Sequence, residues 1–72
     1  MRVVRTHAVD PGEIPKLITD YTANMGWPPT QRELADLLGI SVSTVNYHLR
    51  ALRAEGIVDW QTGSQRTIHV VQ

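Results

Sequence analysis

Residues 26–56 carry the signals for two short helices joined by a tight turn. Thr30 and Ser41 are residue types that cap the starts of helices, and Gly39 between them is the type that ends a helix at positive φ. Glu33 follows Thr30 by three positions, which completes a capping-box pattern. Two helices separated by so short a connection pack against each other at a steep angle, so the segment predicts a helix-turn-helix.

Apolar residues recur at helical spacing on three consecutive segments. The first helix is predicted to begin at Pro11, with Asp10 as its N-cap and Glu13 at N3, or to begin nearer Pro15. It is predicted to end at Gly26. The third is predicted to end at Gly56. The predicted core positions are Ile14, Leu17, Ile18, Tyr21 and Met25 on the first helix, Leu34, Ala35, Leu37 and Leu38 on the second, and Val45, Leu49 and Leu52 on the third, with Val42 at its entry.

The C-terminal part predicts a β-hairpin. Residues 57–60 and 66–71 read as strands, and Gly63 in the turn 61–65 can adopt positive φ. Ile68 and Val70 share one face of the second strand, with Arg66 in phase near the turn. The predicted class is therefore mainly α with a small hairpin: a winged helix-turn-helix of three helices and a two-stranded wing.

The chain of 72 residues predicts one such domain over 11–72. Residues 1–10 form either an N-terminal arm or a short extra edge strand. We expect a cytoplasmic protein without membrane contact, because the sequence has no cysteine, no long apolar run and no signal-peptide core.

The net charge is zero, whereas nucleic-acid-binding domains are usually basic. The distribution of charge matters more than its sum, because a local basic stripe still binds phosphate. Six of the seven basic residues are arginines, and the acids lie mostly at helix starts or on other faces. Weak non-specific affinity for DNA is expected.

One face of the third helix is polar and lies away from its apolar stripe. A recognition helix reads base edges with such a face, near its N-terminus. Asn46 is suited to pair with adenine, and Arg50 with guanine or a phosphate. Helix N-termini favour phosphate. The alternative is a merely solvated face. The candidate DNA-binding residues of this segment are Ser41, Ser43, Thr44, Asn46, Tyr47 and Arg50.

Further candidates flank this helix. Thr30, Gln31 and Arg32, at the start of the second helix, are candidates for the DNA backbone. Arg53 either faces a phosphate or is only a neighbour of Arg50. In the wing, Ser64 and Arg66 are candidates for phosphate or the minor groove, with a solubilising edge charge as the alternative role of Arg66.

The segments Gly26–Ala35, Leu38–Gly39, His48–Leu52, Gly56–Val58 and Gly63–Ile68 resemble the DNA-binding domain of LexA-type repressors. The resemblance covers roughly residues 12–71, and its Gly-x-Pro-Pro-Thr-x-x-Glu-Leu-Ala part is fairly specific. Residues 40–47 depart from it and look one residue shorter, so we expect a different operator. No residues correspond to the family's self-cleaving and dimerising domain, so a stand-alone domain without autoproteolysis is expected.

No enzyme motif stands out, and no cofactor or small-molecule ligand is predicted. His7, His48 and His69 lack metal-ligand spacing, and His48 borders the predicted core. Trp60 is expected to cover the core from the hairpin, whereas Trp27 is either a partly exposed cover or a partner surface.

The sequence therefore predicts a transcriptional regulator that binds double-stranded DNA sequence-specifically. The leading hypothesis is that it acts as a repressor. It would read the major groove with 42–55 and the flanking backbone with 61–66. A homodimer on a palindromic site would supply the specificity that one small domain lacks. The alternatives are a winged-helix protein-interaction module and an architectural or recombination accessory DNA-binding protein.

Overall fold

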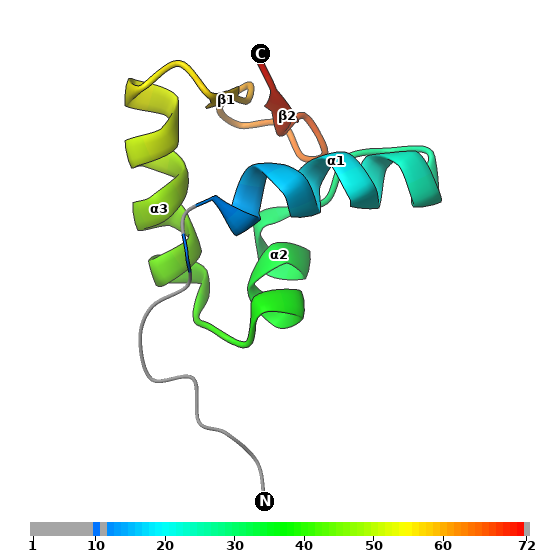
Figure 1. The fold of residues 1–72 in the computed structure, drawn as a ribbon, viewed down its shortest axis with the longest axis horizontal. Coiled ribbons are helices and arrows are strands. Elements are labelled where there is room, and N and C mark those ends of the chain that lie inside the picture. Colours follow the sequence, from blue (N-terminus) through cyan, green and yellow to red (C-terminus); the bar gives the residue numbers. More distant parts are fainter. Residues whose placement is uncertain (1–9, 11, 72) are drawn as a thin grey trace, which may run out of the picture.

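The computed structural model describes residue 10 and residues 12–71. Three helices precede a two-stranded antiparallel hairpin, which confirms the predicted fold class. Figure 1 shows α3 beside α2, with α1 across them and the hairpin at the opposite end from the turn of the helix-turn-helix. The elements are α1 Glu13–Met25, α2 Gln31–Leu38, α3 Val42–Ala54, β1 Val58–Asp59 and β2 His69–Val70. Apart from residue 10, the predicted N-terminal arm or edge strand lies outside the described residues.

The prediction of Asp10 as the N-cap of the first helix is wrong, because α1 begins at Glu13 and its N-cap is Gly12. Asp10 nevertheless holds the segment that leads into the helix. The Asp10 carboxylate accepts a hydrogen bond from the Gly12 N–H at 3.0 Å, and its carbonyl accepts one from the Glu13 N–H at 2.8 Å. Pro15 lies in the first turn, where backbone N–H groups have no partner within the helix, so its missing donor costs nothing there. At the other end Gly26 adopts a left-handed φ of 89°, as a C-terminal cap requires.

The caps predicted for α2 and α3 are confirmed. Thr30 Oγ1 accepts a hydrogen bond from the Glu33 N–H at 3.1 Å, and Glu33 Oε1 accepts one from the Thr30 N–H at 2.9 Å. Ser41 Oγ accepts from the Thr44 N–H at 3.1 Å. Gly39 has a φ of 73°, so the turn between the helices uses the backbone freedom that only glycine offers cheaply.

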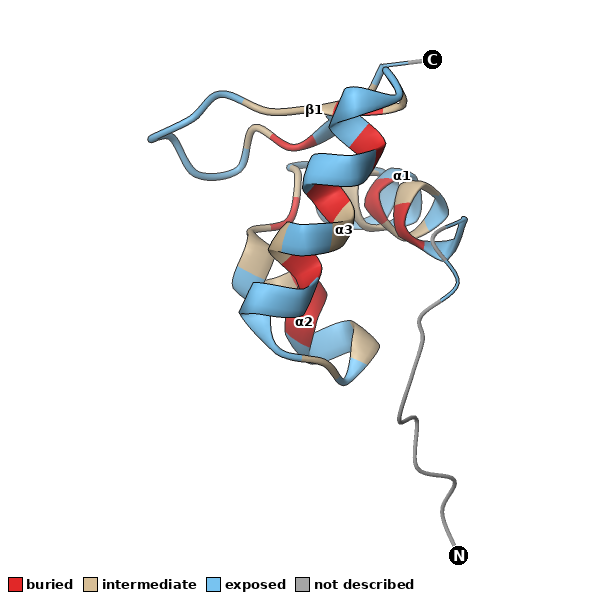
Figure 2. Cartoon of the chain, turned by 90° about the vertical axis from the view of Figure 1, so that its left-hand side faces the viewer, coloured by how far each residue is buried: buried red, intermediate tan, exposed pale blue. Residues whose placement is uncertain are grey.

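All three helices and the hairpin contribute to one hydrophobic core. Figure 2 shows its residues on the faces that the elements turn toward each other. Helix α2 packs on α3, and α1 packs on β2. The buried residues of this core are Ile14, Ile18, Leu34, Ala35, Val45, Leu49, Leu52, Val58 and Ile68. Trp60 packs against this core from the hairpin as predicted, and Leu17 and Leu38 pack at its edge.

Three predicted core residues are exposed. Val42, at the entry of α3, is 37% exposed. Leu37 is 57% exposed because Leu34, Ala35 and Leu38 already form the buried arc of α2, and Leu37 lies about 60° outside that arc. Met25 is 46% exposed although it lies on the apolar stripe of α1. It is the last residue of α1, and Figure 1 shows that this end of the helix projects beyond α2.

The hairpin strands are shorter than predicted. Only Val58 pairs with Val70 and Asp59 with His69. Arg66, predicted to lie in a strand, instead has a left-handed φ of 59°. The connection from 60 to 68 is therefore a wide loop, fastened by a hydrogen bond from the Gln61 N–H to Thr67 Oγ1 at 2.9 Å. Figure 2 shows this loop projecting from the body of the domain.

Candidate nucleic-acid interface

The outward face of α3 is polar over its first three turns. Tyr47 is 71% exposed, and Ser43, Thr44 and Arg50 are exposed as well. A shallow hollow of about 430 Å³ lies on this face, lined by Ser43, Asn46, Tyr47, Arg50 and Ala51. Ser41 and Thr44 share a hydroxyl–hydroxyl hydrogen bond of 2.9 Å at the helix N-terminus. The predicted recognition residues are thus brought to one surface because Val45, Leu49 and Leu52 bury the opposite face.

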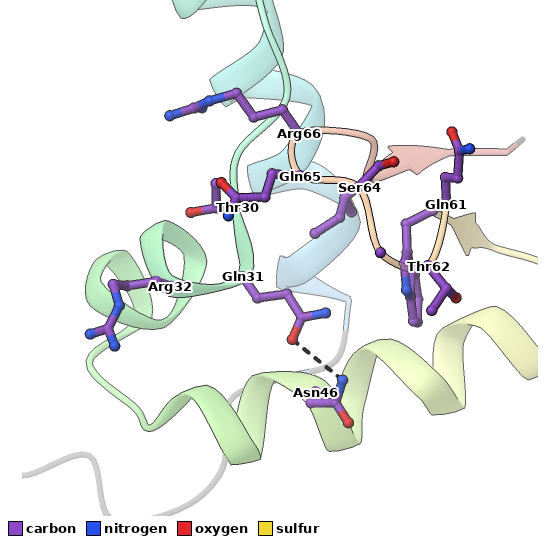
Figure 3. A pocket seen from close by; sticks show the side chains of 12 residues that line it. Thr30, Gln31, Arg32, Asn46, Gln61, Thr62, Ser64, Gln65 and Arg66 are labelled. Atoms are coloured by element: carbon purple, nitrogen blue, oxygen red, sulfur yellow. Dashed lines mark hydrogen bonds between the residues drawn. The ribbon is translucent and has the colours of Figure 1, made fainter.

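A larger hollow of about 640 Å³ lies between the start of α2, the middle of α3 and the hairpin loop. Figure 3 shows the side chains around it. Of the predicted site residues, this hollow is lined by Thr30, Gln31, Arg32, Asn46, Ser64 and Arg66. Three elements far apart in the sequence therefore meet at one concave surface beside α3.

The polar ends of α2 and α3 are joined across this surface. Asn46 Nδ2 donates a hydrogen bond to Gln31 Oε1 at 3.3 Å, which Figure 3 marks with a dashed line. Gln31 is the first residue of α2 and directly follows the N-cap Thr30, within the capping box. Both side chains are half-buried, whereas Ser43, Tyr47 and Arg50 on α3 are exposed.

Arg66 is held by the start of α2. Its guanidinium donates to Glu33 Oε2 at 2.8 Å, to Glu33 Oε1 at 3.0 Å and to the Pro28 carbonyl at 3.0 Å. The guanidinium carbon lies 5.9 Å from the centre of the Trp27 ring, within reach of a cation–π interaction. Tyr21 adds a hydroxyl hydrogen bond to Glu33 Oε1 at 3.0 Å. In Figure 3 the Arg66 side chain is directed away from Asn46.

These contacts lower the pKa of Glu33 from its ordinary value of 4.5 to about 2. The hydrogen bonds from Arg66 contribute most, followed by the Thr30 N–H. The same partnership raises the pKa of Arg66, chiefly through Glu33. The predicted phosphate contact of Arg66 is therefore in competition with an internal carboxylate.

Arg53 is held in a similar way at the other end of the hairpin loop. Its Nε donates to Asp59 Oδ1 at 2.8 Å, one terminal nitrogen donates to the Trp60 carbonyl at 2.8 Å, and its guanidinium carbon lies 4.1 Å from the Trp60 ring centre. The Trp60 N–H and then Arg53 lower the pKa of Asp59. Arg53 lines neither hollow, and its side chain anchors the hairpin to the end of α3.

Among the described residues, the positive charge that has no acidic partner lies on the candidate surface. Within the described part of the chain, Lys16, Arg53 and Arg66 each pair with an acid, whereas Arg32 and Arg50 form no ion pair. These two arginines lie at the start of α2 and in the middle of α3. A chain of zero net charge thus keeps unneutralised positive charge where the polar face of α3 meets the start of α2.

The hollow beside α3 includes residues that were not among the individual candidates. They are Trp60, Gln61, Thr62, Gly63, Gln65 and Ile68. The polar run 61–65 was assigned to the turn, but no sequence signal indicated that the loop would lean toward α2 and α3.

No group of three or more His, Asp or Glu side chains among residues 10 and 12–71 could hold a metal ion. His7 lies outside the described residues. None of the helices in the same part of the chain is long and apolar enough to cross a membrane.

Three helices, of which α2 and α3 form the helix-turn-helix, and a C-terminal hairpin define a winged helix-turn-helix domain. The family model of the LexA DNA binding domain matches residues 12–67. The chain therefore belongs to the LexA DNA-binding domain family, a class of DNA-binding rather than catalytic domains.

Three similar proteins are named LexA repressor. The one from Desulfatibacillum aliphaticivorans is 41% identical over 58 residues, which cover 79% of this chain and 29% of the relative. The one from Teredinibacter turnerae is 37% identical over 59 residues, 81% of this chain and 30% of the relative. The one from Cellvibrio japonicus is 33% identical over 61 residues, 83% of this chain and 30% of the relative. The chain thus spans less than a third of the length of these relatives.

Proposed function

We propose that this domain is a sequence-specific reader of double-stranded DNA that acts as a transcriptional repressor. In this proposal α3 enters the major groove and the loop 61–66 lies along the flanking backbone. The observation that carries it is the convergence of a polar α3 face, the start of α2 and the wing loop on one surface with two unneutralised arginines. Membership of the LexA DNA-binding domain family supports the class of ligand.

Base contacts are assigned to the middle of α3. Asn46 carries the donor and acceptor that fit adenine, and Arg50 carries the donors that fit guanine. Ser43, Thr44 and Tyr47 flank them on the same exposed face. The hydroxyl of Ser41 and the free N–H groups of the first turn of α3 are suited to a phosphate.

Backbone contacts are assigned to the rim of the larger hollow. Arg32 supplies the charge, and Thr30, Gln31 and Ser64 supply polar groups at its edges. Arg66 and Arg53 act chiefly as anchors of the wing, because their guanidinium groups already have carboxylate partners. A second copy on an inverted half-site would double the number of base pairs read, so we propose a homodimer on a palindromic operator.

The experiment that tests the function is selection of binding sites from random duplexes, followed by sequencing and by binding measurements at several salt concentrations. We expect enrichment of a motif, palindromic if two copies bind. Asn46→Ala should relax the preference at one position, whereas Asn24→Ala, which removes a carboxamide from the exposed surface of α1, should not. Absence of any enriched motif would overturn sequence-specific reading and favour a protein-interaction role.

A further inference from the structure

We propose that Gln31 is a positioning residue that orients the carboxamide of Asn46 for reading an adenine in the major groove. The inference rests on the proposed function, because it names the base that Asn46 reads and the residue, Gln31, that orients Asn46 for this contact. The observation behind it is the hydrogen bond between two side chains that are 15 positions apart and lie on different helices of the helix-turn-helix.

The location of Asn46 sets it apart from its neighbours on α3. Asn46 lines both the shallow hollow on the face of α3 and the larger hollow next to the wing. It is half-buried, whereas Ser43, Tyr47 and Arg50 are exposed. A side chain that is partly enclosed and hydrogen-bonded has fewer conformations to lose on binding than a free one.

The hydrogen-bonding capacity of the pair is compatible with base reading. The Asn46 nitrogen carries two hydrogens, and Gln31 takes one of them. The second hydrogen of Nδ2 and both lone pairs of Oδ1 remain available. The hydrogen can be donated to adenine N7, and Oδ1 can accept from adenine N6. With Gln31 Oε1 facing Asn46, the nitrogen of the Asn46 carboxamide is turned toward Gln31.

Without this partner the orientation of the carboxamide would be free. The terminal torsion of asparagine is broad and roughly two-fold, so rotation exchanges the donor and acceptor that face the DNA. The backbone of Gln31 is held in place, since Gln31 is the first residue of α2 and lies between Thr30 and Glu33 of the capping box. Arg66 in turn fastens Glu33 to the wing.

The test begins with a site selected by the wild-type protein and with duplexes in which each of its base pairs is replaced in turn. At one base pair, replacement should weaken binding by the wild type but should no longer change the affinity of Asn46→Ala. That base pair is the one that Asn46 reads, and we expect it to be A·T. The wild type should discriminate at this position by roughly 5- to 150-fold. Gln31→Met, of similar length but without the acceptor, should reduce that discrimination by roughly 2- to 10-fold.

Gln31→Glu retains an acceptor oxygen on the same stem. It should keep most of the discrimination at the A·T position while weakening all duplexes alike, because its added negative charge repels phosphate. Thermal unfolding of each variant reports whether the helices are intact. If Gln31→Met does not fold, Gln31→Ala replaces it, because alanine is the strongest helix former.

The outcomes separate the two proposals. Unchanged discrimination at the Asn46 position in folded Gln31→Met or Gln31→Ala overturns the positioning role and leaves sequence-specific binding intact. An equal loss in Gln31→Glu and Gln31→Met also overturns it, because the acceptor would then not matter. Failure of the wild type to enrich any site overturns the proposed function itself.

Discussion

Arg66 and Glu33, separated by 33 positions, are joined by two hydrogen bonds of 3.0 and 2.8 Å that connect the wing to the start of α2. Glu33 also completes the capping box of Thr30, so one carboxylate serves both the helix-turn-helix and the wing. At the other end of the loop, Arg53 of α3 holds Asp59 and the Trp60 carbonyl. Two arginines thus fasten a hairpin whose strands pair over only two residues each.

Loss of the first fastening should loosen the wing. We expect Arg66→Met and Glu33→Gln each to accelerate amide hydrogen exchange at Gln61 and Ser64, whose N–H groups are bonded within the loop. The double variant should exchange no faster than Arg66→Met, because the two side chains act through one interaction. Lys16→Met, which breaks an exposed ion pair with Asp20 on α1, is the control. Additive effects of the two substitutions would argue against a shared clamp.

The same contact predicts an acid-sensitive component of stability. The pKa of Glu33 is lowered in the folded state to about 2 from an ordinary value of 4.5, so its contribution is complete above about pH 4.5 and is lost as the pH falls toward 2. The difference in Tm between wild type and Glu33→Gln should therefore be largest above pH 4.5 and should close as the pH approaches 2. Circular dichroism melts across this range measure it.

A matched control separates this effect from the general titration of acids. Glu55→Gln removes an exposed carboxylate at the end of α3 that makes no ion pair among the described residues. Its Tm difference from wild type should not show the same closing between pH 4.5 and 2. A constant difference between wild type and Glu33→Gln over the whole range would contradict the prediction. The pKa of Asp59 is also lowered, but Asp59 is present in both wild type and Glu33→Gln and therefore does not change the difference in Tm between them.

Two leucines of the helix-turn-helix should respond very differently to truncation. Leu49 is fully buried, so Leu49→Ala should lower the free energy of unfolding by about 2–5 kcal/mol. Leu37 is 57% exposed, so Leu37→Ala should change the free energy of unfolding by no more than about 0.5 kcal/mol. Urea denaturation of both variants checks this. A large loss in Leu37→Ala would restore the sequence-based assignment of this residue to the core.

The salt dependence of DNA binding should depend on the arginines without a carboxylate partner. Arg32→Ala should flatten the slope of log affinity against log salt by about 0.9, the value for one lost phosphate contact. Lys16→Ala should leave the slope unchanged, because Lys16 lies on α1 and pairs with Asp20. Fluorescence anisotropy on a selected duplex at several salt concentrations gives both slopes. Equal slopes for Arg32→Ala and wild type would remove Arg32 from the interface.

Local features of the chain were predictable because their causes are local. The caps at Thr30, Glu33 and Ser41 and the stop at Gly39 depend on side chains within a few positions of the backbone groups that they satisfy. The order of helices and hairpin follows from the period of the apolar residues. The polar face of α3 follows from the same period, since a helix with one apolar stripe presents its other residues to solvent.

The failures concern residues whose environment is set by distant parts of the chain. Leu37 and Met25 are apolar and lie near or on the predicted stripes, but the neighbouring elements do not extend over them. Arg66 was predicted in a strand because alternation continues through it. Its left-handed backbone accompanies contacts with Glu33 and Pro28, which sequence spacing does not reveal.

The sequence alone therefore determined the elements, their caps and the polar face of the third helix, because these depend on interactions along a single segment. Only the tertiary structure decided which arginines are neutralised, how the wing is attached and that Gln31 meets Asn46. Those relationships join residues 6 to 38 positions apart. Such contacts form only when burial of Ile14, Leu34, Leu49 and the rest of the core has fixed the angles between the helices and the hairpin.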